Sequence, residues 1–168
     1  CLPDPSFFRF CEELLERYRD DDRIAQISGD NFQFGRRRTA DSYYFSRFNH
    51  IWGWATWRRA WKNYDVNLAT WPQARDGGWL QDILGDSRQA SYWSRLFQRV
   101  ADGAIDTWDY QWVFACWVSS ALTILPNTNL VSNIGFGPAA THTTRDSQFA
   151  NMETASMQFP LHHPEFVI

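Results

Sequence analysis

The chain lacks the features that mark several specialised classes of protein. Its longest apolar run, residues 112–118, has 7 residues, whereas a membrane-spanning helix needs about 20. Its three cysteines, Cys1, Cys11 and Cys116, are odd in number and show no CxxC spacing. That pattern predicts free thiols in a reducing, cytoplasmic compartment, not a disulfide framework or a zinc site. The first residues also lack the basic start and apolar stretch of a signal peptide.

A broad basic surface is also missing. The net charge is −3, and the only basic cluster is Arg36-Arg37-Arg38, so no electrostatic footprint for nucleic acid is present. The cluster could make a local phosphate contact, but a solvated loop is the favoured interpretation. We therefore expect neither a nucleic-acid partner nor a transmembrane segment.

Aromatic residues, by contrast, are abundant. They make up 17% of the 168 residues and include 10 tryptophans. A chain of this length suits one domain that buries roughly 70% of its unfolded surface. Core packing would use most of these rings, while a few could stack on the C–H faces of a sugar.

Hydrophobic periodicity predicts an α/β fold. Asp4-Pro5 is typical of a helix start, and residues 24–29 predict a buried strand. Trp54, Trp57, Trp61 and Tyr64 recur at helical spacing. Further helices are expected over the following stretches: residues 92–100, closed by Gly103, and residues 109–120. Further strands are expected here: residues 43–45, 122–125 and 129–132. Residues 65–78 are expected to be irregular.

Acidic residues are clustered in two segments, residues 20–22 and 106–109. Asp20-Asp21-Asp22 lies between a helix end and a strand, which predicts a solvated turn. Asp109 directly precedes the buried helix, so it is either that helix's N-cap or a carboxylate base at the rim of a pocket. Asp106 either assists it or caps the turn. A glycosidase pair formed by these two acids is disfavoured, because such carboxylates must face each other across a sugar.

Two glycine-containing segments are candidate ligand contacts. In His50-Ile51-Trp52-Gly53-Trp54, the glycine lets the backbone approach a ligand or a neighbouring chain segment; a packed aromatic corner is the alternative. Ser132, Asn133, Gly135 and Gly137 form a loop whose N–H groups suit phosphate oxygens. His142 could ligate a metal or contact a diphosphate, or simply lie on the surface.

Five segments of the chain form a pattern by their order and spacing. They are Leu2-Pro3-Asp4-Pro5-Ser6-Phe7-Phe8, Ile27-Ser28-Gly29-Asp30-Asn31, Trp52-Gly53-Trp54-Ala55-Thr56-Trp57, Trp108-Asp109-Tyr110-Gln111-Trp112, and Ile134-Gly135-Phe136-Gly137 with Ala140-Thr141-His142. In these segments the chain resembles bacterial family 2-type glycosyltransferases and, more distantly, the N-acetylglucosaminyltransferases of the GT-A fold.

The resemblance implies a partial GT-A-like α/β domain without the N-terminal nucleotide-binding strands. Residues 1–145 would be its acceptor-side part and residues 146–168 an irregular tail. Asp109 would be the catalytic base. His50, Trp52, Gly53, Trp54 and Trp108 would line the sugar and acceptor site, and the loop with His142 would fold over the donor's diphosphate.

The implied reaction is transfer of a sugar from a nucleotide-diphospho-sugar to an acceptor hydroxyl, with inversion favoured. The acidic motif that holds Mn²⁺ or Mg²⁺ in such enzymes would precede Cys1, so we expect the isolated chain to be nearly inactive. A homo-oligomer could form through surfaces left uncovered. The alternative interpretation is a non-catalytic carbohydrate-binding or oligomerisation module.

Overall fold

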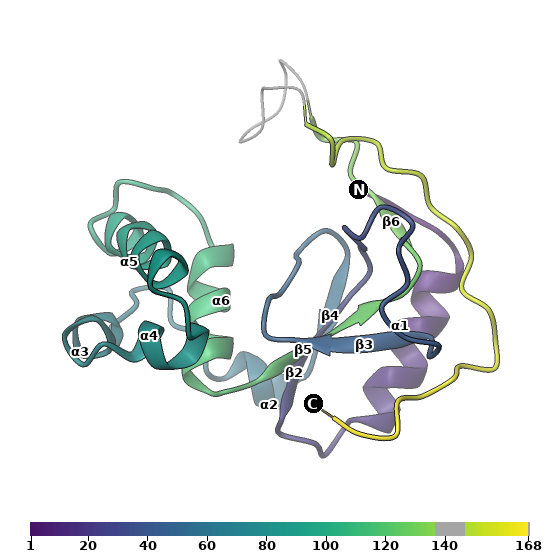
Figure 1. The fold of residues 1–168 in the computed structure, drawn as a ribbon, viewed down its shortest axis with the longest axis horizontal. Helices are drawn as coiled ribbons and strands as arrows, with labels where there is room; N and C mark the ends of the chain where they lie inside the picture. The colour runs from purple at the N-terminus through teal and green to yellow at the C-terminus, as the bar shows by residue number, and fades with distance from the viewer. Residues whose placement is uncertain (137–146, 168) are drawn as a thin grey trace. The chain divides into compact units, whose positions relative to one another are not determined.

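The computed structural model describes residues 1–136 and 147–167, and the chain divides into two compact units (Figure 1). Unit 1 comprises Cys1–Trp57 and Leu122–Ile168, and unit 2 comprises Arg58–Ala121. Both helices and strands are present, so the architecture is mixed α/β, as the periodicity predicted.

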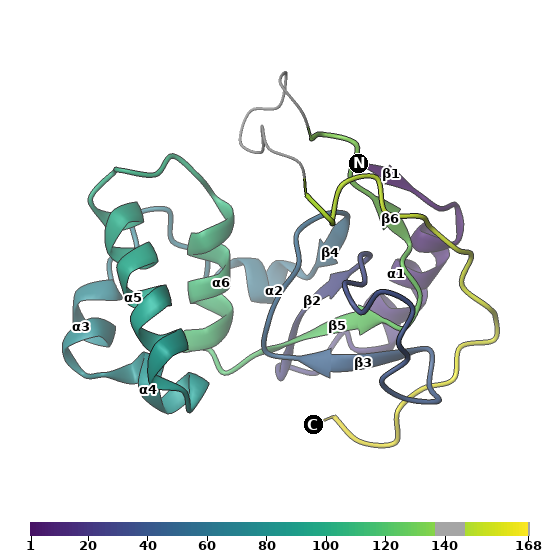
Figure 2. The same cartoon turned by 45° about the horizontal axis from the view of Figure 1, so that its top comes forward.

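Unit 1 is built on a four-stranded sheet with helix α1 (Ser6–Arg17) packed against it (Figure 2). The strand order is β3-β5-β2-β4. The central pair β2–β5 is parallel and the outer pairs are antiparallel. The strands have these bounds: β2 Ile24–Ser28, β3 Tyr43–Ser46, β4 Trp54–Thr56 and β5 Leu122–Pro126. A separate ribbon pairs β1 (Leu2–Pro3) with β6 (Val131–Ser132).

One face of the sheet forms the core of unit 1. Cross-strand partners lie on the same face, and one row of partners consists of Phe45, Ile124, Ile27 and Ala55. This row belongs to the apolar cluster that α1 covers with Phe10 and Leu14, both fully buried. The apolar face of α1 therefore packs on the apolar face of the sheet.

The adjacent row, on the other face, is polar. It consists of Ser46, Thr123, Gln26 and Thr56, one residue from each strand. Gln26 and Thr123 are nonetheless buried. Since buried polar groups need hydrogen-bond partners, this face must be covered by backbone that supplies them.

Unit 2 is helical. Its elements are α2 (Arg58–Trp61), α3 (Trp71–Asp76), α4 (Trp79–Leu84), α5 (Ser87–Ala101) and α6 (Asp109–Val118). The apolar face of α5 packs on α6 through aromatic rings, as in the edge-to-face contacts of Phe97 with Phe114 (5.2 Å between centroids) and Trp93 with Trp117 (4.8 Å). Trp112 and Trp117 are buried in α6, so the prediction of a helix that is apolar nearly all round is confirmed.

Three sequence expectations need correction. The helix predicted through Trp54 and Trp57 is wrong, because residues 54–56 pair with β2 as strand β4, and only Arg58–Trp61 is helical. Tertiary pairing overrides local helical spacing here. Residues 65–78 are not irregular throughout: they contain α3, whose Pro72 lies in the first turn, where proline is tolerated.

The third correction concerns Asp109, which is the first residue of α6 and not its N-cap; Trp108 occupies the cap position. At the N-terminus of α1, Pro5 occupies the cap position and Ser6 is the first helical residue, one residue later than Asp4-Pro5 predicted. The Asp4 carboxylate still accepts the Ser6 N–H at 2.8 Å and so satisfies a helix-end donor. The acidic run at 20–22 forms a turn, in which Asp21 pairs with Arg23.

The segment after the undescribed residues has no helix or strand over residues 147–167. It is nevertheless tied to unit 1: Met157 and Leu161 enter the core cluster, and the Met157 N–H bonds Ser6 Oγ at 2.8 Å.

All three cysteines are free thiols, and burial raises the pKa of Cys11 to about 12. Within the described residues, no helix has the length and apolar character needed to cross a membrane.

Candidate functional site

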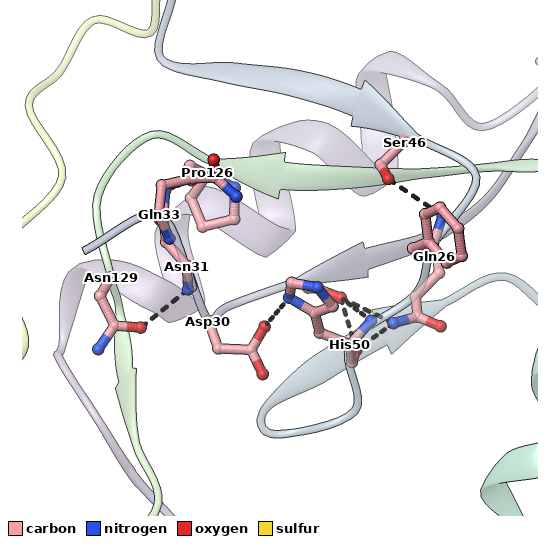
Figure 3. A network of polar contacts seen from close by, with 10 residues as sticks. Gln26, Asp30, Asn31, Gln33, Ser46, His50, Pro126 and Asn129 are labelled. Atoms are coloured by element: carbon pink, nitrogen blue, oxygen red, sulfur yellow. Dashed lines mark hydrogen bonds and ion pairs between the residues drawn. The ribbon is translucent and has the colours of Figure 1, made fainter. Parts of the chain in front are cut away.

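The polar face of the sheet in unit 1 is covered by residues 47–53. Gln26 and Ser28, two residues apart on β2, both donate side-chain hydrogen bonds to the carbonyl oxygen of His50, the serine at 2.6 Å. The His50 N–H in turn donates to Ser28 Oγ at 3.3 Å, and the Asn49 amide donates to Gln26 Oε1 at 3.2 Å. The backbone of this loop is therefore held from the strand beneath it (Figure 3).

Asp30 continues the same alternation and holds the side chain of His50. Its Oδ1 lies 2.7 Å from His50 Nδ1 (Figure 3). Asp30 is 1% exposed, whereas the side chain of His50 is 17% exposed. Burial raises the pKa of the Asp30 carboxyl, and the bond to His50 acts in the opposite direction. The other carboxylate oxygen, Oδ2, is buried and has no hydrogen-bond partner among the described residues.

An aromatic cluster lies on one face of the imidazole, which it contacts through Phe32. The ring of Phe32 stacks on His50 with centroids 4.4 Å apart, and its edge meets Trp52 at 5.1 Å. Trp52 also meets Phe136 edge-to-face at 5.4 Å, and Phe149 packs on Phe32 at 4.8 Å. Rings from four separate stretches of sequence thus converge around one partly exposed histidine.

The glycines of these segments permit the convergence. Gly53 has φ of 71°, and a Cβ at this position would lie 2.5 Å from a methyl group of Val131 in β6. Its carbonyl accepts the Gly29 N–H at 2.8 Å, and the Gly29 carbonyl accepts the Leu130 N–H at 2.8 Å. The close approach expected at Gly53 is made to a neighbouring chain segment, and it joins residues 29, 53 and 131.

Trp54 is placed differently from Trp52. It lines a groove of about 850 Å³ beside α1, together with Phe8 and Trp57. The two tryptophans that flank Gly53 therefore belong to different surroundings, and the structure brings only Trp52 to His50.

The loop after β6 is described only to Phe136. Ser132 pairs with Leu2 across the β1–β6 ribbon, and Asn133 Oδ1 accepts the Gly135 N–H at 2.9 Å in a tight local turn. Gly135 itself is exposed. Gly137 and His142, the other predicted diphosphate contacts, lie outside the described residues.

Asp109 belongs to unit 2, where it occupies the first turn of α6. The positive end of the helix dipole favours a carboxylate there. The Thr107 hydroxyl donates to Asp109 Oδ1, and the carbonyl of Thr107 accepts from the buried side chain of Gln111 at 2.7 Å. Asp106 is exposed on the preceding loop. The partly exposed Asp109 carboxylate is thus held in place by its neighbour.

Aromatic rings lie near this carboxylate within unit 2. Trp61 and Tyr64 stack face to face, 4.4 Å apart and 6° from parallel, and Trp61 remains 39% exposed. Burial raises the pKa of Tyr64 and of Tyr110, and the charge of Asp109 acts in the same direction on both. Trp108, 41% exposed, immediately precedes the acid.

Metal ligands are not assembled in the part of the chain that the structure describes. No group of three His, Cys, Asp or Glu side chains there could hold an ion. Asp30 and His50 provide two ligand-type groups, but they are bonded to each other. The described residues by themselves do not fit a divalent metal.

Sequence reasoning identified His50, Trp52 and Gly53 as candidates but missed Asp30, Gln26 and Ser28 as the groups that hold them. A signal was present: Gln26, Ser28 and Asp30 alternate with apolar residues, so a strand places them on one face. The sequence predicts a buried strand here, and the alternation shows that one of its faces is polar and needs hydrogen-bond partners.

Comparisons of the chain with protein-family models, with curated proteins and with solved structures found no match.

Proposed function

We propose that this chain takes part in a glycosyltransferase reaction, in which a sugar is transferred from a nucleotide-diphospho-sugar to a hydroxyl group of an acceptor. The observation that best supports the proposal is the convergence within unit 1. Residues 27–31, 52–57 and 134–136 belong to segments that carry the resemblance and are far apart in sequence. They meet through the Gly29–Gly53 hydrogen bond and the contact of Trp52 with Phe136.

In the proposed reaction, Asp109 accepts the proton of the acceptor hydroxyl. The freed oxygen forms a bond to the anomeric carbon, while the bond from that carbon to the diphosphate breaks and its electron pair leaves with the diphosphate. Attack opposite the leaving group gives inversion. The position of Asp109 supports this role, since its carboxylate is partly exposed in the first turn of α6 and is oriented by the Thr107 hydroxyl.

The loop that begins at Ser132 would contact the departing diphosphate through backbone N–H groups. In enzymes of the kind that the chain resembles, a divalent ion neutralises the same charge. Mn²⁺ or Mg²⁺ thus remains an expectation of the proposal.

Substitution of Asp109 by Asn tests the role of the base. Loss of the proton acceptor should lower turnover by about 10²–10⁴-fold and leave ligand binding nearly unchanged. The measurement is the initial rate of sugar transfer by the protein as its gene encodes it, with Mn²⁺ and a panel of nucleotide sugars, followed by mass spectrometry of the product.

Asp106→Asn is the matched control, because it removes an exposed carboxylate three residues away without touching α6. Normal turnover in the Asp109 variant would remove this residue as the base. Equal loss in both variants would point to the loop and not to proton transfer.

A second candidate is non-catalytic carbohydrate binding. It is favoured by the parallel Trp61–Tyr64 stack, whose exposed aromatic surface next to a carboxylate suits the C–H faces and hydroxyls of a sugar. Saturable quenching of tryptophan fluorescence by sugars, without transfer from any donor, would favour this function over catalysis.

A further inference from the structure

The Asp30–His50 pair in unit 1 has a geometry that packing does not require. A buried carboxylate costs free energy unless all of its lone pairs find donors. Asp30 is 1% exposed, and its Oδ2 has no hydrogen-bond partner within the described part of the chain. Its one side-chain bond, 2.7 Å long, goes to His50 Nδ1. The backbone N–H of Trp52 also acts on this carboxylate, so Asp30 joins β2 to both His50 and Trp52 of the covering loop.

The neighbouring contacts indicate what the pair does. The backbone of His50 is held at both its N–H and its carbonyl by Ser28, and Phe32 covers one face of the imidazole at 4.4 Å. The ring therefore has a defined position and orientation. Among the residues that the structure describes, only Nδ1 of this ring has a hydrogen-bond partner.

Burial raises the pKa of Asp30, whereas the bonds from His50 and from the Trp52 N–H favour its ionised form. An ionised carboxylate only accepts hydrogen bonds, so in that form the partner nitrogen of His50 carries the proton. A neutral imidazole protonated at Nδ1 has a lone pair on Nε2 and no hydrogen there. We propose that Asp30 is a positioning residue that holds His50 in this tautomer, so that Nε2 accepts a hydrogen bond from a hydroxyl group of a bound ligand.

The chemistry of the ligand follows from the tautomer and its surroundings. A lone pair on Nε2 attracts a hydroxyl donor and repels the oxygens of a phosphate. Trp52, which meets the edge of Phe32 beside the histidine, offers a partly exposed aromatic surface for the C–H face of a sugar ring. Carbohydrate is therefore the ligand class, an assignment that rests on the proposed function.

The first test needs no variant. In protein labelled with ¹⁵N at histidine, the chemical shifts and couplings of the ring nitrogens distinguish the two tautomers. His50 is assigned by its loss in His50→Gln. The expected result is protonated Nδ1 and unprotonated Nε2. A His50 ring protonated at Nε2 would overturn the proposal, since Asp30 would then donate to the ring.

Asp30→Asn provides the second test, because the amide has nearly the same shape but can donate to Nδ1. The expected outcome is a reversed tautomer with unchanged circular dichroism; in serine proteases the same change beside a histidine produces the wrong tautomer. Asp41→Asn is the control, since Asp41 lies in the same unit and accepts a bond from Thr39, not from an imidazole. A tautomer that stays the same in Asp30→Asn would reduce Asp30 to a structural residue.

The ligand is tested with glucose, galactose and N-acetylglucosamine as probes at millimolar concentrations. At least one should shift the Nε2 resonance of the wild type, and the shift should be lost in Asp30→Asn and kept in Asp41→Asn. Inorganic phosphate should cause no shift at Nε2. If the tautomer is as expected but phosphate, and no sugar, shifts Nε2, the carbohydrate assignment is wrong. None of these measurements depends on turnover, so failure of sugar transfer would overturn the proposed function and leave Asp30 as the positioning residue.

Discussion

The two faces of the four-stranded sheet in unit 1 are both buried, but they are covered by different kinds of groups. On one face, Ile27 and Ile124 are covered by apolar side chains of α1. On the other, Gln26 and Ser28 are equally buried but are covered by the backbone of residues 47–53. Apolar contacts are non-directional, whereas hydrogen bonds fix position. The first face supplies stability, and the second face specifies where His50 lies.

The largest effect is expected on the apolar face. Ile27→Ala removes a fully buried side chain from the core, which should lower the free energy of unfolding by about 2–5 kcal/mol. Urea titration followed by circular dichroism measures the change. A loss below about 0.5 kcal/mol would mean that α1 does not pack on the sheet as described.

A smaller loss of stability is expected for a substitution on the polar face, at the residue before Ile27. Gln26→Met keeps the length of the side chain but removes the donor to the His50 carbonyl and the acceptor for Asn49. The His50 carbonyl keeps its bond from Ser28, so the expected cost is that of lost hydrogen bonds, about 0.5–1.5 kcal/mol. Gln158→Met, at an exposed position, is the control and should unfold like the wild type. An increase in stability for Gln26→Met would show that this face tolerates apolar packing.

The smallest effect concerns a polar contact at the margin of the apolar face. His163 Nδ1 lies 2.9 Å from the hydroxyl of Tyr43, and burial lowers the pKa of His163, with the charge of Arg17 acting in the same direction. The unfolded chain then binds a proton at a higher pH than the native chain. The contribution of this group to stability is present above about pH 6.5 and is lost as the pH falls through the lower native value.

The wild type should lose stability between about pH 7.5 and about pH 5.5, and His163→Gln should lose less. Unfolding in urea at the two pH values measures this difference. His162→Gln is the control, because His162 bonds Ser42 only through its backbone. Identical pH dependence in the wild type and His163→Gln would contradict the assignment.

Local patterns predicted much of the fold. The helical spacing of Phe7, Cys11 and Leu14 predicts the buried face of α1. The apolar character of residues 109–120 predicts a buried helix, which the structure places at Asp109–Val118. Strand β4 was missed, since Trp54 and Trp57 have the spacing of a helix and only pairing with β2 decides otherwise. That pairing joins residues about 30 positions apart, which no local window contains.

The site was predictable in part for the same reason. His50, Trp52 and Gly53 were recognisable from local composition, but their support comes from Gln26, Ser28 and Asp30 on a different element. The alternation along β2 indicates that these polar residues share a face. The loop that covers them is fixed only by the fold as a whole.

Native-state hydrogen exchange at the His50 amide, which donates to Ser28 Oγ, tests the contrast between the two faces most directly. We predict that this amide is protected in the wild type and exchanges faster in Gln26→Met, whereas Ile27→Ala accelerates the amides of the β2–β5 ladder and leaves His50 unchanged. An unprotected His50 amide in the wild type, or one that responds to Ile27→Ala and not to Gln26→Met, would contradict the division between a stabilising face and a positioning face.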